Sequence, residues 1–186
     1  YQFSSIEGAD AYEAELRAIR AFYYFHLLDM FGNVPLSTDF TDTETKPNST
    51  RSEVYNFVKS ELDAVIPLLS DKKDATTYGR INKWAALAIR MQLQLNAEVY
   101  TGTAQWAAAK TDADAIINSG LYSLEAVYSD NFKEQNEGSS ENIFVVPYDE
   151  VFASGFNWVA MTLHYASQNT FNLTFQPWNG YATVEE

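Results

Sequence analysis

Apolar side chains recur at steps of three or four along the first part of the chain, which is the spacing of one helical face. The pattern predicts a first helix from Ala9 to Phe31. The residues at this spacing are Leu16, Ile19, Tyr23, Leu27 and Met30. Gly32 can adopt the left-handed cap conformation and Pro35 cannot continue a helix, so the helix should end here.

The same helix carries bulky side chains in five consecutive positions, Phe22 to His26. A helix on the surface of a domain needs only one apolar stripe, with polar residues on its back. Rings on every side therefore indicate that other parts of the protein cover this helix on more than one side.

A second helix is predicted after Thr50, which forms a capping-box pattern with Glu53. Pro67 should end its regular part. Its apolar positions are Val54, Phe57, Val58, Leu62, Val65 and Leu69. Residues 37–49, before this helix, are rich in threonine, aspartate and proline and indicate a loop.

Two further helices are predicted at residues 82–100 and 104–118, the second closed by Gly120. Joined by a short turn, they form a hairpin about as long as one tetratricopeptide repeat. Trp84 and Trp106 fall on periodic apolar faces, so we place both in the helical core. One such hairpin cannot cover its own apolar face and needs neighbours stacked on it.

The pattern changes after residue 120. The run Ile143 to Tyr148, which contains Pro147, predicts a short strand or an extended segment. From Asp149 to Glu186 the chain is rich in Asn, Ser, Thr, Gly and aromatic residues, without a sustained helical period. Long irregular segments in compact domains are usually functional, so we expect a binding site here.

Composition narrows the choice of partner. Lysine and arginine number 12 against 25 aspartates and glutamates, and the net charge of −13 argues against nucleic acid and anionic lipid. A neutral ligand such as a sugar is insensitive to this charge, and 12 tyrosines, 12 phenylalanines and 4 tryptophans supply flat faces for stacking. The absence of cysteine excludes disulfides, thiolate catalysis and cysteine-ligated metals.

No apolar run approaches the roughly 20 residues of a membrane span, and no signal peptide is visible. The chain begins at Tyr1, and its last residues predict the start of a further helix, so we expect a part of a longer protein. The sequence has no glycine-rich phosphate loop, no Gly-x-Ser-x-Gly elbow and no His-Glu-x-x-His motif, and we predict no cofactor and no metal site. The two histidines, His26 and His164, are interpreted as structural rather than catalytic.

Six sequence motifs follow one another along nearly the whole chain. The first is the aromatic helix with its Phe-Gly-x-Val-Pro-Leu ending, "RAIRAFYYFHLLDMFGNVPL". The others are "TRSEVYNFVKSELDAVIPLL", "YGRINKWAALAIRMQLQLNAEVYTG", "WAAAKTDADAIINSGLYSL", "SSENIFVVPY" and "QPWNGYATVEE". In this order they resemble the SusD/RagB family of surface glycan-binding lipoproteins, and their spread makes the resemblance specific.

The resemblance implies a mostly α-helical fold in which residues 1–186 are part of a single SusD-like domain. Residues 1–120 would form the tetratricopeptide-like scaffold and residues 121–186 the irregular glycan-binding region. It also implies a protein that is not an enzyme and is held by a lipid anchor, absent from this chain, at the outer face of the outer membrane. There it would capture oligosaccharide or polysaccharide and deliver it to a SusC-like, TonB-dependent transporter.

The resemblance also implies the site. In the family's starch-binding member an aromatic residue directly after Asn-Gly stacks on sugar, and the matching residues here are Asn179 and Tyr181. Trp178 adjoins them, and Phe152 and Trp158 lie where a second stacking ring is expected. Alternatively, Trp178 and Tyr181 only fasten the loop to the helices.

Two other functions compete with this interpretation. A tetratricopeptide-like scaffold can hold an extended peptide or protein segment on a concave helical surface. A glycosidase needs two carboxylates facing one another across a cleft. The neighbouring acids Glu13 with Glu15, and Asp149 with Glu150, are instead typical of a solvated face.

Overall fold

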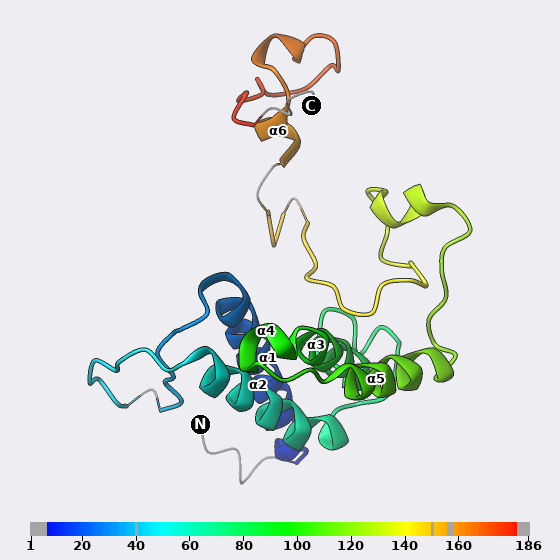
Figure 1. The fold of residues 1–186 in the computed structure, drawn as a ribbon. Helices are drawn as coiled ribbons and strands as arrows, with labels where there is room; N and C mark the ends of the chain where they lie inside the picture. Colours follow the sequence, from blue (N-terminus) through cyan, green and yellow to red (C-terminus); the bar gives the residue numbers. More distant parts are fainter. Residues whose placement is uncertain (1–6, 40, 150, 156–157, 182–186) are drawn as a thin grey trace. The chain divides into compact units, whose positions relative to one another are not determined.

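The fold was obtained as a computed structural model that describes residues 7–39, 41–149, 151–155 and 158–181. The chain divides into two compact units, Tyr1–Val145 and Val146–Glu186. Figure 1 shows that the long helices all belong to the first unit. The described residues contain no β-strand, only one isolated antiparallel bridge between Asp149 and Ala153. The protein is therefore mostly α-helical.

Helices α1 (Ala9–Phe31) and α2 (Arg51–Val65) form an antiparallel pair in the first unit. Their ends are those that the sequence predicts. Gly32 caps α1 with a φ of 71° and donates its backbone N–H to Leu28. Thr50 and Glu53 form the complete capping box at the start of α2, and the short 3₁₀ helix η1 (Ile66–Leu68) follows it.

Helix α1 does not bury the face whose spacing predicted the helix. The residues that it buries are Ala14, Ala18, Ala21, Phe25 and Leu28, which repeat at steps of three and four on another side of the helix. The face with the larger side chains is exposed, with Tyr23 at 64% and Met30 at 65%. Small alanines let α2 approach closely, whereas no described element covers the larger side chains. Periodicity identified a helix here but not its inner face.

The third predicted helix is interrupted. Helix α3 (Lys83–Leu95) ends at Asn96, and the single turn α4 (Ala97–Thr101) follows. Helix α5 (Trp106–Asn118) packs on α3, as expected for a tetratricopeptide-like hairpin. Trp84 lies half-buried against the core and donates its indole N–H to the carbonyl of Asp71 at 2.7 Å.

The prediction that Trp106 lies in the helical core is wrong, because 59% of this residue is exposed. Among the described helices α5 packs on α3 alone, and it does so through Ala109, Asp112 and Ile116. Trp106 is the first residue of α5 and lies beyond that contact.

In the described part of the first unit, three ion-pair clusters join segments that are distant in the sequence. Glu61 of α2 binds Arg17 and Arg20 of α1, and it is only 7% exposed. Asp112 of α5, at 4% exposure, accepts a two-bond contact from Arg90 of α3. The third cluster joins Arg80 and Glu15, which brings the loop before α3 to α1.

Residues 121–145 complete the first unit without forming a strand. Ile143 and Phe144 pack on the helical core, and the ring of Phe144 meets the ring of Phe22 edge to face. The segment is therefore extended rather than paired. The 3₁₀ helix η2 (Tyr128–Phe132) lies in the loop that precedes it.

Candidate functional site

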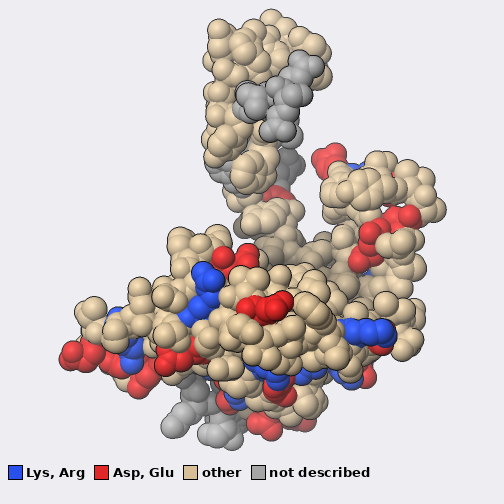
Figure 2. Space-filling model, viewed as in Figure 1, with Lys and Arg blue, Asp and Glu red and all other residues tan. Residues whose placement is uncertain are grey.

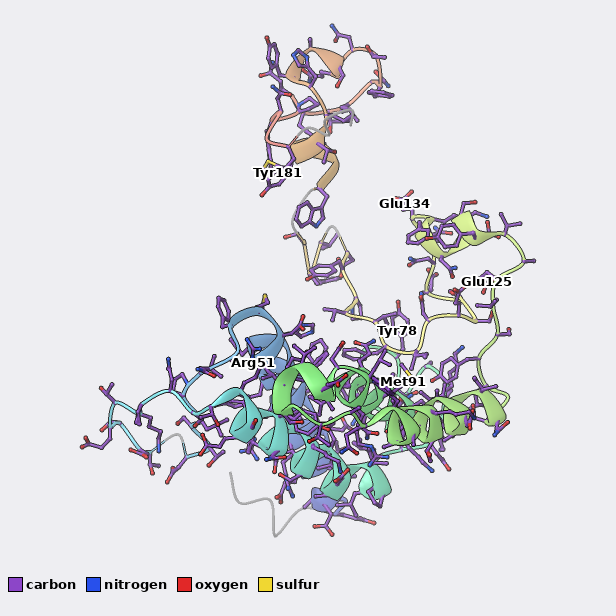
Figure 3. The ribbon with its side chains drawn as sticks, viewed as in Figure 1. Arg51, Tyr78, Met91, Glu125, Glu134 and Tyr181 are labelled. Carbon is purple, nitrogen blue, oxygen red and sulfur yellow. The ribbon has the colours of Figure 1, made fainter. Side chains whose placement is uncertain are left out.

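The second unit is built around the single helical turn α6 (Trp158–Thr162). Four successive backbone N–H groups fasten the segment 178–181 to the end of this turn. Trp178 donates to Ala160 at 2.6 Å, and Asn179 donates to Leu163 at 3.1 Å. Gly180 and Tyr181 both donate to Met161, at 2.7 and 3.0 Å. Backbone bonds thus fix the position of the Tyr181 side chain, which is labelled in Figure 3.

This arrangement brings two of the predicted aromatic residues together. The rings of Trp158 and Tyr181 are stacked, with centroids 6.1 Å apart and planes at 28°. Trp158 is 63% exposed and Tyr181 is 56% exposed, so neither ring is part of a core. Trp178, at 55% exposure, precedes Asn179 in the same fastened segment. The interpretation that these rings only close the loop would have them turned inward.

The Asn-Gly pair shapes the turn that carries Tyr181, in a way the sequence predicted only in part. Asn179 has a φ of 52°, the left-handed conformation that asparagine tolerates better than most residues. Gly180 does not need that conformation. A side chain added there would overlap the sulfur of Met161, so the Met161 side chain would have to move. Glycine at this position thus permits the close approach to α6.

Phe152 lies in a separate turn of the same unit and is 92% exposed. Asp149 organises this turn, since its Oδ1 accepts the backbone N–H groups of Phe152 at 2.6 Å and Val151 at 2.7 Å. These bonds hold the pKa of the Asp149 carboxyl below its ordinary value. Asp149 is therefore engaged in the turn. Its neighbour in the suggested acidic pair, Glu150, lies outside the described residues.

Charged side chains are rare in the part of the second unit that the structure describes. Asp149 is the one Asp, Glu, Lys or Arg among these positions, and Figure 2 shows little red or blue over them. Its polar groups are mostly amides and hydroxyls of Asn, Gln, Ser and Thr. Exposed rings beside neutral hydrogen-bonding groups suit a ligand that has both apolar C–H faces and hydroxyls.

The two histidines and Glu15 contact other residues of the protein. His164 accepts the N–H of Ala166 through Nδ1 and begins the 3₁₀ helix η3 (Tyr165–Ser167). His26 is exposed, with its ring against that of Phe22 at 4.5 Å. Glu15 pairs with Arg80. Within the described part of the chain there is no group of three or more potential metal ligands, and none of its helices is long and apolar enough to span a membrane.

These observations define a class, that of helical proteins of tetratricopeptide-like architecture with exposed aromatic side chains on an irregular segment. The chain belongs to the SusD-like family. Residues 6–95 match the family model described as "Starch-binding associating with outer membrane".

Individual relatives agree with this assignment. The starch-binding protein SusD of Bacteroides thetaiotaomicron is 32% identical over 135 residues, which cover 71% of this chain and 24% of that protein. A SusD superfamily protein from Bacteroides fragilis superposes with a TM-score of 0.71 at 25% identity, over 86% of this chain and 34% of that one.

A third relative was solved with a ligand. Surface glycan-binding protein A from Bacteroides thetaiotaomicron, in complex with laminarihexaose, superposes with a TM-score of 0.64 at 29% identity. The match covers 76% of this chain and 29% of that one. This chain spans about a quarter of the length of the curated relatives that it matches.

Proposed function

We propose that this protein captures neutral oligosaccharide or polysaccharide without modifying it. Trp158 and Tyr181 form the centre of the binding surface, Asn179 and Trp178 flank them, and Phe152 provides a further ring. The observation that carries the proposal is the stacked, exposed pair of rings on a segment whose described positions include one Asp and no Glu, Lys or Arg. In this proposal residues 1–120 are the scaffold and residues 121–186 carry the binding region of one SusD-like domain. No cofactor takes part.

Sugar binding explains why rings and amides are combined. The C–H face of a pyranose packs on an aromatic ring, while its hydroxyls exchange hydrogen bonds with nearby amides. The relative solved with laminarihexaose and the starch-binding relative make β-1,3-glucans and starch fragments the first glycans to test.

A Tyr181→Ala variant should lose about 1 kcal/mol or more of glycan binding free energy, because one ring of the stacking surface is removed. The dissociation constant should rise at least about fivefold. Calorimetric titration with a panel of soluble glycans would measure this loss. Tyr128→Ala is the matched control, since Tyr128 is an exposed tyrosine (74%) of the first unit. Its removal should leave the affinity unchanged.

The same titrations separate the competing functions. Equal affinities of Tyr181→Ala and the unaltered protein would remove Tyr181 from the site. Tight binding of a peptide without any response to carbohydrate would favour the peptide-binding scaffold. Release of reducing ends during long incubation would favour a hydrolase.

We further propose that the full-length protein is a lipid-anchored cell-surface protein of the outer membrane and passes its glycan to a SusC-like, TonB-dependent transporter. Family membership supports this part of the proposal. Affinity purification of the tagged protein from outer membranes in mild detergent should recover such a transporter in near-equal amount. Recovery of the protein from the soluble fraction, without a transporter, would contradict it.

A further inference from the structure

The first unit contains a pocket lined by polar and aromatic side chains, between two of its loops. Residues within 73–78, before α3, form one wall, and residues 137–140 form the other. The pocket has a volume of about 670 Å³, within the range of small-ligand sites. Its lining includes Lys73, Asp74, Tyr78, Leu121, Glu137 and Ser139. Tyr78 is labelled in Figure 3, near the extended segment that follows the second wall.

Lys73 joins the two walls. Its ammonium group donates to the carbonyl of Ser140 at 2.9 Å and to that of Leu121 at 3.3 Å, and it lies 4.2 Å from the centre of the Tyr122 ring. Burial lowers the pKa of Lys73. The ammonium group of Lys73 therefore already has partners within the protein and does not indicate a site for an anionic ligand.

Hydrogen bonds fix both walls before any ligand arrives. On one side the Oδ1 of Asp74 accepts the backbone N–H of Thr76 at 2.8 Å and its hydroxyl at 2.5 Å. On the other side the Oε1 of Glu125 accepts the N–H and the hydroxyl of Ser140, at 2.6 and 2.7 Å. A preformed pocket avoids the entropy cost of ordering loops around a ligand.

The lining indicates the chemistry of the ligand. Tyr78 and Leu121 offer apolar surface, being 44% and 38% exposed. The carboxylate of Glu137 can accept ligand hydroxyls, and so can that of Asp74, because the Thr76 bonds occupy its Oδ1 alone. Two carboxylates disfavour an anion. Hydrogen-bond acceptors beside apolar surface suit a neutral polyhydroxylated molecule.

We propose that the pocket at Tyr78 is a second carbohydrate site that binds a short stretch of neutral glycan, with Tyr78 as its stacking ring. The choice of ligand class rests on the proposed function. The site itself rests on a different unit and different residues from the surface at Tyr181, so the two can fail separately.

Methyl-labelled leucine and methionine in the full-length protein would report on the two sites during titration with maltohexaose and laminarihexaose. Leu121 lines the pocket at Tyr78, and the methyl group of Met161 lies beside Gly180. We expect both signals to move. Tyr78→Ala should weaken the affinity read at Leu121 at least about fivefold and leave the affinity read at Met161 unchanged.

Two further variants test whether the effect at Leu121 is specific to the pocket. Glu137→Gln, an exposed change that removes only charge, should also weaken binding at Leu121, whereas Tyr128→Ala should not. Leu121 signals that do not move with either glycan, or that move equally in Tyr78→Ala, would overturn this inference. A response at Leu121 without one at Met161 would support it and would contradict the proposed surface at Tyr181.

Discussion

Replacing Glu61 with glutamine should lower the free energy of unfolding by about 3 kcal/mol, because it removes one partner of a largely buried charge cluster. The Glu61 side chain is 10% exposed and binds Arg17 at 2.8 Å as well as Arg20. Glutamine keeps the size of the side chain but leaves both guanidinium groups without their carboxylate. Urea unfolding would measure the loss.

Glu98→Gln is a matched control for this change. Glu98 is an exposed glutamate in α4, and a surface substitution of this kind should change stability by less than about 0.5 kcal/mol. Equal stabilities of the Glu61 and Glu98 variants would show that the cluster does not stabilise the contact between α1 and α2.

The effect of Glu61 should depend on pH. Burial, the largest single influence, raises the pKa of its carboxyl, but the hydrogen bonds and charges of Arg17 and Arg20 together lower it below its ordinary value. The folded state therefore holds the proton less tightly than the unfolded chain does. The stabilisation should be complete above about pH 5 and disappear as the pH falls through the folded pKa. A stability difference between the two proteins that stays constant down to pH 2 would contradict this assignment.

Much of the helical scaffold could be predicted, because its signals are local. The capping box of Thr50 and Glu53, the cap at Gly32 and the hairpin after Asn82 all depend on residues a few positions apart. The inner face of α1 could not be predicted in the same way. Two faces of that helix are apolar, and the contact with α2 selected the one lined with alanine.

The features that could not be predicted depend on contacts between residues that are far apart in the sequence. Arg17 lies 44 positions from Glu61, and Arg90 lies 22 positions from Asp112, so no local pattern reveals either pair. Sequence likewise gave no reason to single out Tyr78. Its importance arises only when the loop at residues 71–80 faces the loop at residues 137–140.

The residues of the proposed glycan surface could be predicted from the sequence, but their arrangement could not. The Asn-Gly pair pointed to a turn that presents Tyr181, and the family resemblance pointed to Trp158 as a further ring. Their stacking could not be read from the sequence, because it depends on four backbone hydrogen bonds between the segment 178–181 and the end of α6.

Asp112 should be at least as sensitive as Glu61, with a loss of about 4 kcal/mol expected for Asp112→Asn. Its carboxylate accepts two bonds from Arg90, at 2.8 and 2.6 Å, and one from the amide of Gln94 at 3.1 Å. The side chains of Asp112 and Arg90 are 5% and 20% exposed, so water can replace little of what asparagine loses. Asp114→Asn, on the same helix but in a surface pair with Lys110, should cost less than about 0.5 kcal/mol.

A double replacement would show whether charge or packing holds α3 to α5. Arg90→Met combined with Asp112→Leu leaves neither partner unpaired and keeps apolar volume in the contact, so it should recover most of the stability that Asp112→Asn loses. The recovery should be incomplete, because Asp63 and Gln94 also lose a partner. If the double variant is less stable than Asp112→Asn, the ion pair itself, rather than the avoidance of an unpaired buried charge, stabilises the hairpin of the scaffold.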